Sequence, residues 1–320
     1  MKKFYKILLI LGASLFIVGG ILFTIGMFFS GWSFNGLSNV DYERKTYEIN
    51  SNSVENIVIE VDTENVEFIT VEGDKITVEY SNVKNKKGNT LSEIIPEIDG
   101  NTLILKEFDK KFALTFSFFS SNNKMTVKLP SNKALSIKVE TSTGDVLLGE
   151  QNKETTYSNI NVETNTGDFK VLGKVNCLDN FSVELDTGSI ITNGEIICKN
   201  NLYFEVDTGK INVNSKITAT GVSFTADTGK IVIGGFINAN SISFETDTGD
   251  VICESLILAN TITASADTGD VTLILKGDKS DYSYFYEKAT GKSNIPAYSS
   301  GSRTIKVKTD TGDINISFKE

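Results

Sequence analysis

The chain has 320 residues, with 31 Lys and Arg against 41 Asp and Glu, no His and three Cys. The net charge of -10 argues against nucleic acid as a partner, because phosphate binding needs clustered Lys and Arg. The lack of His excludes Ser-His and Cys-His nucleophile pairs and imidazole ligands for Zn or Cu. The three Cys show no C-x-x-C spacing, so they indicate neither a disulfide framework nor a metal site.

The N-terminus reads as a signal anchor. Three lysines in residues 1–6 precede an uncharged, mostly apolar stretch at 7–29, which as a helix is long enough for a hydrocarbon core of about 30 Å. The stretch is longer than the apolar region of a cleaved signal peptide. The positive-inside rule then predicts a cytoplasmic segment 1–6, a transmembrane helix 7–29 in the lipid bilayer, a linker 30–47 and an extracellular remainder.

Residues 48–139 are predicted to be an N-terminal β region that caps the repeats. Apolar and polar residues alternate from Val58 to Phe68, as in a half-buried strand, and this stretch contains an Asp62-Thr63 turn. A second alternation, at 112–119, predicts a strand that either packs into the cap or exposes aromatic side chains to a partner.

One short motif, Thr-Gly-Asp or Asp-Thr-Gly, recurs along residues 140–320. The first steps between its glycines are 20 to 23 residues, and the final gap of 43 contains a further copy at Ala289-Thr290-Gly291. Periods of 20 to 50 residues indicate a repeat architecture. The predicted turn glycines are Gly144, Gly167, Gly188, Gly209, Gly229, Gly249, Gly269, Gly291 and Gly312.

The residues between these glycines indicate strands. After Gly229, apolar residues fall at 231, 233, 242 and 244 with polar residues between them, which is a period of two. The sequence therefore predicts an all-β fold, a right-handed parallel β-solenoid of about 20–21-residue coils over 140–320. A tight inward corner is expected where small residues recur ten positions after each glycine, at Cys177, Cys198, Ala219, Ala239 and Ala259.

A family resemblance follows from these motifs. The N-terminal anchor, the early Ile57-Val58-Ile59-Glu60-Val61 strand, the Met125–Pro130 strand and the Thr-Gly-Asp repeats resemble the bacterial "putative adhesin" family of domains of unknown function. LiaG-like envelope proteins of Gram-positive bacteria look similar. The resemblance covers about residues 45–320 and implies the solenoid fold and an association with the cell surface, without catalytic residues to carry over.

Two columns of Asp could carry chemistry. One precedes Thr-Gly and the other follows Gly, and the simplest role for both is to cap the turns by accepting backbone N–H groups. A Ca²⁺ site is the alternative, since hard cations take several carboxylate oxygens. The candidate ligands are Asp207, Asp227, Asp247 and Asp267.

Two further features leave alternatives open. Cys177 and Cys198 are predicted to stack in one inward column, as buried thiols or as a disulfide. The Tyr-rich stretch 282–298 is predicted to be core of a terminal cap or an exposed patch for a partner.

The sequence favours a non-enzymatic, membrane-anchored cell-surface module, an adhesin or envelope-interaction protein without a cofactor. Its partners are expected to be an envelope component or a second copy of the chain. The alternatives are a regulatory accessory protein of envelope stress and a carbohydrate-active β-helix enzyme, although enzymes of that kind group carboxylates in clefts made by long loops, which nearly loop-free coils lack.

Overall fold

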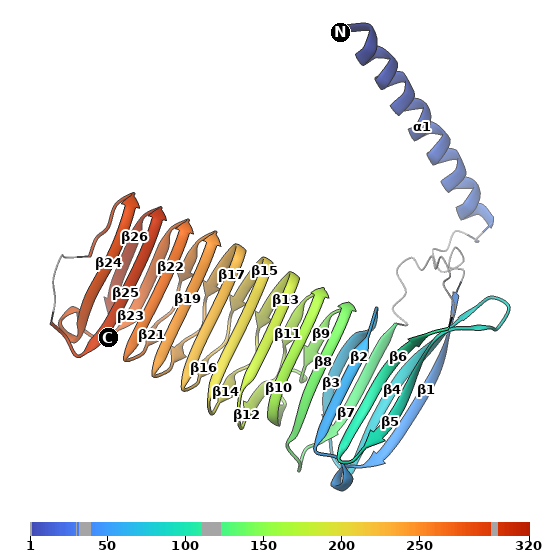
Figure 1. Ribbon diagram of the computed structural model, residues 1–320, viewed down its shortest axis with the longest axis horizontal. Coiled ribbons are helices and arrows are strands. Elements are labelled where there is room, and N and C mark those ends of the chain that lie inside the picture. The colour runs from blue at the N-terminus through green and yellow to red at the C-terminus, as the bar shows by residue number, and fades with distance from the viewer. Residues whose placement is uncertain (1, 30, 32–39, 111–122, 296–299) are drawn as a thin grey trace. The chain divides into compact units, whose positions relative to one another are not determined.

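The computed structural model describes residues 2–29, 31, 40–110, 123–295 and 300–320. Within them lie one α-helix, two short 3₁₀ turns and 26 β-strands (Figure 1). The chain divides into two compact units, of which the first contains residues 1–45, 81–93 and 108–123 and the second contains the rest. The predicted strand at 112–119 lies outside the described residues.

The first unit contains the helix α1 (Lys2–Phe29) and parts of four strands. The expected helix at 7–29 is confirmed, but no helix in the described part of the chain is long and apolar enough to cross a membrane, so the expected transmembrane span is not supported. Strand β1 (Val40–Asn50) begins inside the stretch 30–47, where a linker was expected. Strands β4 (Lys75–Asn85) and β5 (Thr90–Asp99) pair antiparallel between Val83 and Ser92.

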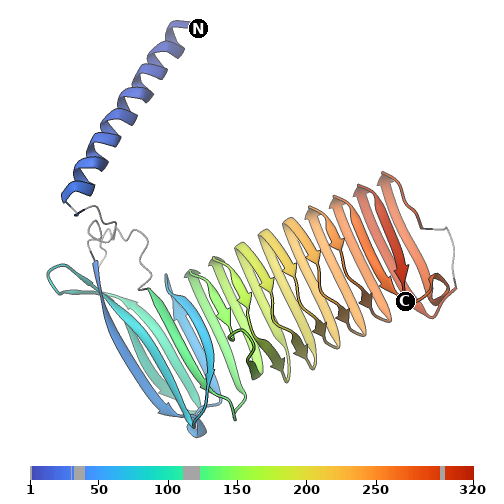
Figure 2. The same ribbon diagram turned by 180° about the vertical axis from the view of Figure 1, so that it is seen from behind.

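The second unit is the predicted parallel β-solenoid, of about 8 coils spaced about 21 residues apart, and Figure 2 shows the same stack from behind. In its middle, β13 (Phe181–Thr192), β15 (Asn201–Val213), β17 (Gly221–Ile233) and β19 (Ser241–Thr248) pair parallel and in register. The Asp-Thr-Gly corners of consecutive coils are stacked directly on one another, because Gly188, Gly209 and Gly229 are register partners. The right-handed sense of the coils stays a prediction.

The remaining strands complete the coils around these four. On the N-terminal side they are β2 (Asn56–Val61), β3 (Asn65–Val71), β6 (Thr102–Asp109), β7 (Lys124–Pro130), β8 (Leu135–Thr143), β9 (Val146–Leu148), β10 (Glu154–Thr166), β11 (Phe169–Val171), β12 (Lys174–Cys177) and β14 (Ile196–Cys198). On the C-terminal side they are β16 (Ile217–Thr218), β18 (Ile237–Asn238), β20 (Val251–Cys253), β21 (Ile257–Leu258), β22 (Thr261–Thr268), β23 (Val271–Lys276), β24 (Tyr282–Thr290), β25 (Arg303–Thr311) and β26 (Ile314–Lys319).

In the core, inward side chains at equivalent positions of successive coils form columns. Because the register is preserved, inward side chains of one coil contact the same position in the next coil. Phe204 stacks on Phe224 with ring centroids 5.1 Å apart, and Phe224 stacks on Phe244 at 5.5 Å. Such aromatic pairs add about 0.5–1.5 kcal/mol each beyond the area they bury. The small-residue corner is also confirmed, since Cys177 and Cys198 are buried there.

The order of coils in space departs from the order in sequence at both ends. At the start, β2 lies between β6 and β8, although about 40 residues separate β2 from β6. At the end, β22 pairs with β25, and β25 pairs with β24 on its other side (Figure 1). The predicted turn at Gly291 therefore exists, but it forms the last corner of the stack rather than the corner between Gly269 and Gly312. Equal spacing of the repeats fits both orders, so the period alone could not reveal the exchange.

Candidate functional site

The glycine corner requires glycine for two reasons. Gly229 has φ +152°, a conformation that residues with a side chain rarely adopt. In addition, a Cβ built on Gly229 would overlap the carbonyl oxygen of Gly209 in the preceding coil. The same close approach repeats along the predicted glycines, and Gly144 differs only in lacking the positive φ and in contacting the carbonyl of Glu64.

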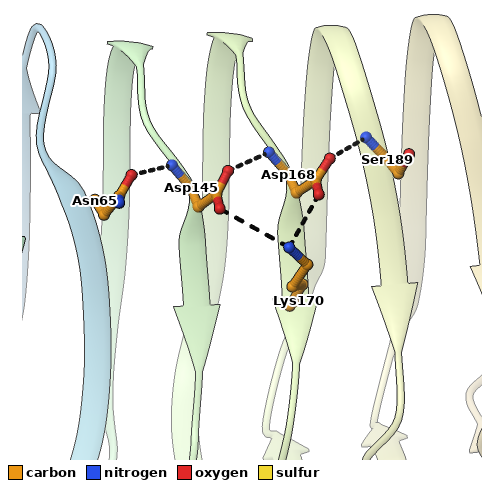
Figure 3. Close-up of polar contacts among 5 residues, drawn as sticks. All are labelled: Asn65, Asp145, Asp168, Lys170 and Ser189. Atoms are coloured by element: carbon orange, nitrogen blue, oxygen red, sulfur yellow. Dashed lines mark hydrogen bonds and ion pairs between the residues drawn. The ribbon is translucent and has the colours of Figure 1, made fainter. Parts of the chain in front are cut away.

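The Asp residues that follow several of the corner glycines join neighbouring coils. Figure 3 shows the start of this ladder, where the N–H of Asp145 donates to Asn65 Oδ1 at 2.8 Å and the N–H of Asp168 donates to Asp145 Oδ1 at 2.9 Å. The N–H of Ser189 then donates to Asp168 Oδ1 at 3.0 Å. Lys170 Nζ lies 2.9 Å from Asp168 Oδ2 and neutralises part of the column. The ladder thus links the corners of these N-terminal coils from Asn65 to Ser189.

The same ladder returns in the C-terminal coils. The N–H of Asp270 donates to Asp250 Oδ1 at 3.0 Å, that of Asp313 donates to Asp270 Oδ1 at 2.8 Å, and that of Lys292 donates to Asp313 Oδ1 at 2.7 Å. These bonds follow the spatial order of coils and not the chain order, since Lys292 precedes Asp313 in sequence.

The Asp column that precedes Thr-Gly does not cap the turns. Its members point into solvent, and no backbone N–H among the described residues donates to their carboxylates. The predicted capping role therefore belongs to the other column. The exposed members are Asp186, Asp207, Asp227, Asp247, Asp267 and Asp310.

A column of glutamates runs parallel to these exposed aspartates, four residues before several of the corner glycines. It was missed from the sequence, although its position relative to the glycines could have revealed it. Parallel pairing places five of its members in consecutive coils. They are Glu60, Glu140, Glu163, Glu184 and Glu205. We call the glutamates and the exposed aspartates together the acidic face.

Burial and neighbouring negative charges both disfavour ionisation of two carboxyls of the acidic face. Burial, followed by the carboxylates of Glu184 and Asp207, raises the pKa of Glu205. Burial and the neighbouring carboxylates of Asp207 and Asp247 likewise raise the pKa of Asp227. Two unit charges 4 Å apart repel by about 1 kcal/mol in water, so the solvated face tolerates its charge without a bound ion.

The Ca²⁺ candidates do not converge on one point. Asp207, Asp227, Asp247 and Asp267 stand one to a coil, and within the described ranges no group of three or more Asp, Glu, Cys or His is arranged to hold a metal ion. The Ca²⁺ hypothesis stays a prediction that the side-chain geometry does not support.

A polar cavity of about 320 Å³ lies at the N-terminal end of the acidic face, and it is open to solvent. Lys106 and Glu60, an ion pair, form part of its wall. Glu107 forms another part, and its Oε2 accepts the N–H of Asp62 at 2.7 Å, which closes the first corner of the solenoid. The other charged lining residues are Asp62 itself, Glu140 and Glu163.

Glu64, two residues after the cavity-lining Asp62, occupies the position that glycine holds in later coils. Only 1% of its surface is exposed, and its Oε2 has no hydrogen-bond partner among the described residues. Burial, followed by the Glu107 carboxylate, raises the pKa of Glu64 to about 9. Glu64 is therefore a neutral, protonated carboxyl at pH 7. The segment Asp62-Thr63-Glu64-Asn65 resembles the later Asp-Thr-Gly corners. The Glu that replaces Gly in it is the sequence feature from which this site could have been found.

The cysteine column contains free thiols. Cys177 and Cys198 are register partners in adjacent coils, and both are buried and unbridged. The Cys177 thiol donates to the carbonyl of Asn180 at 3.1 Å, and the Cys198 thiol donates to that of Asn201 at 3.3 Å. The prediction of buried thiols is confirmed.

The Tyr-rich stretch is partly cap core and partly exposed. Tyr282 and Tyr284 are buried against Phe318, with ring centroids 5.6 and 5.9 Å away. Phe285 is 58% exposed on the outer side of β24. Residues 296–299, including Tyr298, lie outside the described residues.

Several solved structures are similar to this chain. One is described as a "putative adhesin" from Bacteroides fragilis, at 14% identity and a TM-score of 0.45, and the match covers 86% of this chain and 97% of that one. Another "putative adhesin", from Parabacteroides merdae, has 12% identity, 87% and 97% coverage and a TM-score of 0.45. A "putative lipid binding protein" from Parabacteroides distasonis has 16% identity, 87% and 97% coverage and a TM-score of 0.39. At these TM-scores the likenesses carry no argument about function.

No curated protein matches the chain. A family model does match, over residues 54–317, and it confirms the family resemblance expected from the repeats. The chain belongs to the Toastrack family of domains of unknown function, DUF4097.

Proposed function

We propose that this protein is a non-enzymatic surface module of the cell envelope that binds an extended partner along its acidic face. The observation that carries the proposal is the register of the glutamate column, which places five carboxylates in consecutive coils on one side of a stiff sheet. A surface that repeats at every coil suits a polymer with repeating groups, because many weak contacts add up when the partner carries the same spacing.

The charge of the face indicates the chemistry of such a partner. The carboxylates of Glu163, Glu184 and Glu205 lie in adjacent coils, and the pKa of Glu205 is raised by its neighbours. Positive charges brought to the face would relieve this repulsion. An envelope polymer or protein with spaced cationic groups therefore fits better than an anionic one, and its association would weaken as salt rises.

Attachment to a membrane is part of the proposal. Large apolar side chains of α1 are exposed, among them Phe16 and Phe29, each at 84%. Such a surface favours an apolar surrounding. We place the N-terminus in the cytoplasm and the solenoid outside the cell. In Asn39→Cys, the new thiol should react with a membrane-impermeant reagent on intact cells, and labelling that needs cell lysis would overturn this orientation.

A charge-neutral variant tests the binding face. Replacing Glu163, Glu184 and Glu205 together by Gln should reduce retention of the full-length protein on isolated envelopes at low salt by tenfold or more. The matched control replaces three glutamates at another corner by Gln, namely Glu150, Glu195 and Glu254. Equal retention of both triple variants, with normal circular dichroism, would contradict the proposal.

A further inference from the structure

One corner of the solenoid departs from the repeat. Between β9 and β10 the chain runs through five residues, 149–153, whereas the equivalent corner of the next coil, between β11 and β12, consists of 172 and 173. The residues that flank the two corners are register partners, so the coils on either side stay in phase. The additional residues must therefore leave the outline of the coil, and 151–153 are exposed. In repeat proteins such insertions often lie on the binding face.

The longer corner forms one wall of a cavity of about 660 Å³ that is open to solvent. The rest of the lining comes from the corners of the next two coils, at 172–174 and 193–194. Sites for small molecules commonly have volumes of about 300–1,000 Å³. The cavity is thus large enough for a small ligand or for a short segment of a polymer.

The backbone of the longer corner is fixed by a turn. The N–H of Lys153 donates to the carbonyl of Glu150 at 3.0 Å, which places Gln151 and Asn152 at the tip of the turn. Asn152 has φ +65°, and no other residue in the described ranges except glycine has a positive φ. Asn tolerates this conformation better than most residues do. The turn therefore positions two adjacent amide side chains on the cavity wall.

The lysines of the cavity are already paired with carboxylates. Lys153 Nζ lies 2.7 Å from Glu150 Oε2, and Lys174 Nζ lies 3.1 Å from Glu154 Oε2. The charges of these four groups sum to zero. A charged ligand would have to compete with one of these ion pairs for its counter-charge. The cavity therefore favours an uncharged ligand, in contrast to the acidic face.

The amide side chains of the cavity can serve such a ligand. The amides of Gln151 and Asn152 make no hydrogen bond within the described part of the chain. Asn193 Oδ1 accepts from Asn214 Nδ2 at 3.0 Å, which leaves the NH₂ group of Asn193 as a donor. A carboxamide offers donors and an acceptor side by side, which matches the neighbouring hydroxyl groups of a sugar ring. Leu172, also in the lining, offers apolar surface to the C–H groups of such a ring.

We propose that this cavity binds a short segment of an uncharged glycan. The site is separate from the acidic face, because it uses other residues and a partner without charge. The binding is weak, with a Kd on the order of millimolar, since the amides exchange contacts with water for contacts with the glycan. Because no net charge is involved, salt has little effect on it.

Saturation-transfer NMR on the full-length protein, in a detergent without a sugar headgroup, tests the ligand class. The probe is triacetylchitotriose, an uncharged trisaccharide, and its deacetylated form is the matched control because it has the same rings but carries ammonium groups. At high salt, which screens the acidic face, we expect saturation transfer to the uncharged trisaccharide and little to the deacetylated one. No transfer to the uncharged form would overturn this proposal and leave the role of the acidic face untouched.

Substitutions at the tip of the turn locate the site. The double variant Gln151→Ala, Asn152→Gly removes both amides, and a glycine adopts the positive φ without strain, so the corner should fold. Its affinity for triacetylchitotriose should fall tenfold or more, with an unchanged thermal melt. The matched control is Asn315→Ala, which removes an exposed amide from β26, outside the cavity. Unchanged affinity in the double variant, or an equal loss in Asn315→Ala, would contradict the assignment of the site.

Discussion

Replacing Glu64 by Gln should stabilise the protein at neutral pH and leave its stability at pH 4 unchanged. In the folded chain the pKa of Glu64 is about 9, because the carboxyl is buried and lies against Glu107, whereas that of an exposed glutamate is 4.5. Between these values the folded state binds a proton that the unfolded state has lost. The free energy of unfolding therefore falls as pH rises through this window.

The size of the effect follows from the pKa values. At pH 7, which lies about 2.5 units above 4.5, retaining the proton costs the wild type up to about 3 kcal/mol, at about 1.36 kcal/mol per unit. Gln has the same shape and needs no proton, so Glu64→Gln avoids this cost. At pH 4 both side chains are neutral, and the two proteins should be equally stable.

Urea unfolding followed by circular dichroism at pH 4, 7 and 9 measures this difference. Asp186→Asn, which removes one carboxylate from the exposed acidic face, controls for a general effect of net charge. The reasoning is refuted if the stability difference between Glu64→Gln and wild type is the same at pH 4 and pH 7, or if Asp186→Asn gives the same pH dependence.

Two further substitutions test the corner. Gly229→Ala should destabilise the solenoid by about 3 kcal/mol or more, because the new Cβ would overlap the Gly209 carbonyl and because Ala is strained at this φ. The control is Ser243→Ala, on the outer face of β19, which should change stability little in the same thermal melts. Asp168→Ala should cost about 1–2 kcal/mol because the N–H of Ser189 loses its acceptor. Asp168→Asn keeps that acceptor oxygen and should recover most of the loss, and equal melts of the two variants would contradict the ladder.

Much of the fold could be predicted from spacing. The glycine period, the two-residue alternation and the small residues at Cys177 and Cys198 depend only on local geometry, and all of them match the solenoid. The exchange of coils at both ends could not be predicted. The spacing of Gly291 fits a coil inside the stack as well as one at its end, and the order of β22, β25 and β24 comes from the strand pairing alone.

The candidate site was less predictable. Two Asp columns flank the Thr-Gly pairs, both of them present at 247–250, 267–270 and 310–313, and the sequence does not tell which carboxylate reaches the neighbouring coil. The structure assigns the hydrogen bonds to the column of Asp145 and Asp168 and exposes the column of Asp207. The role of Glu64 could not be predicted from the sequence, since its raised pKa depends on burial and on the carboxylate of Glu107, which is 43 positions later in the chain.

Deleting residues 230–249 tests the central claim, that function is spread along a repeating face. The deletion removes one coil, joins Gly229 to Asp250 and restores an Asp-Thr-Gly-Asp corner. Register is preserved because positions 221–228 and 261–268 each pair in phase with 241–248. We predict that the shortened protein folds with a modest loss of stability and retains most of its binding to isolated envelopes. A shortened protein that folds normally but binds no envelope component would contradict the distributed face and indicate a single site in these coils.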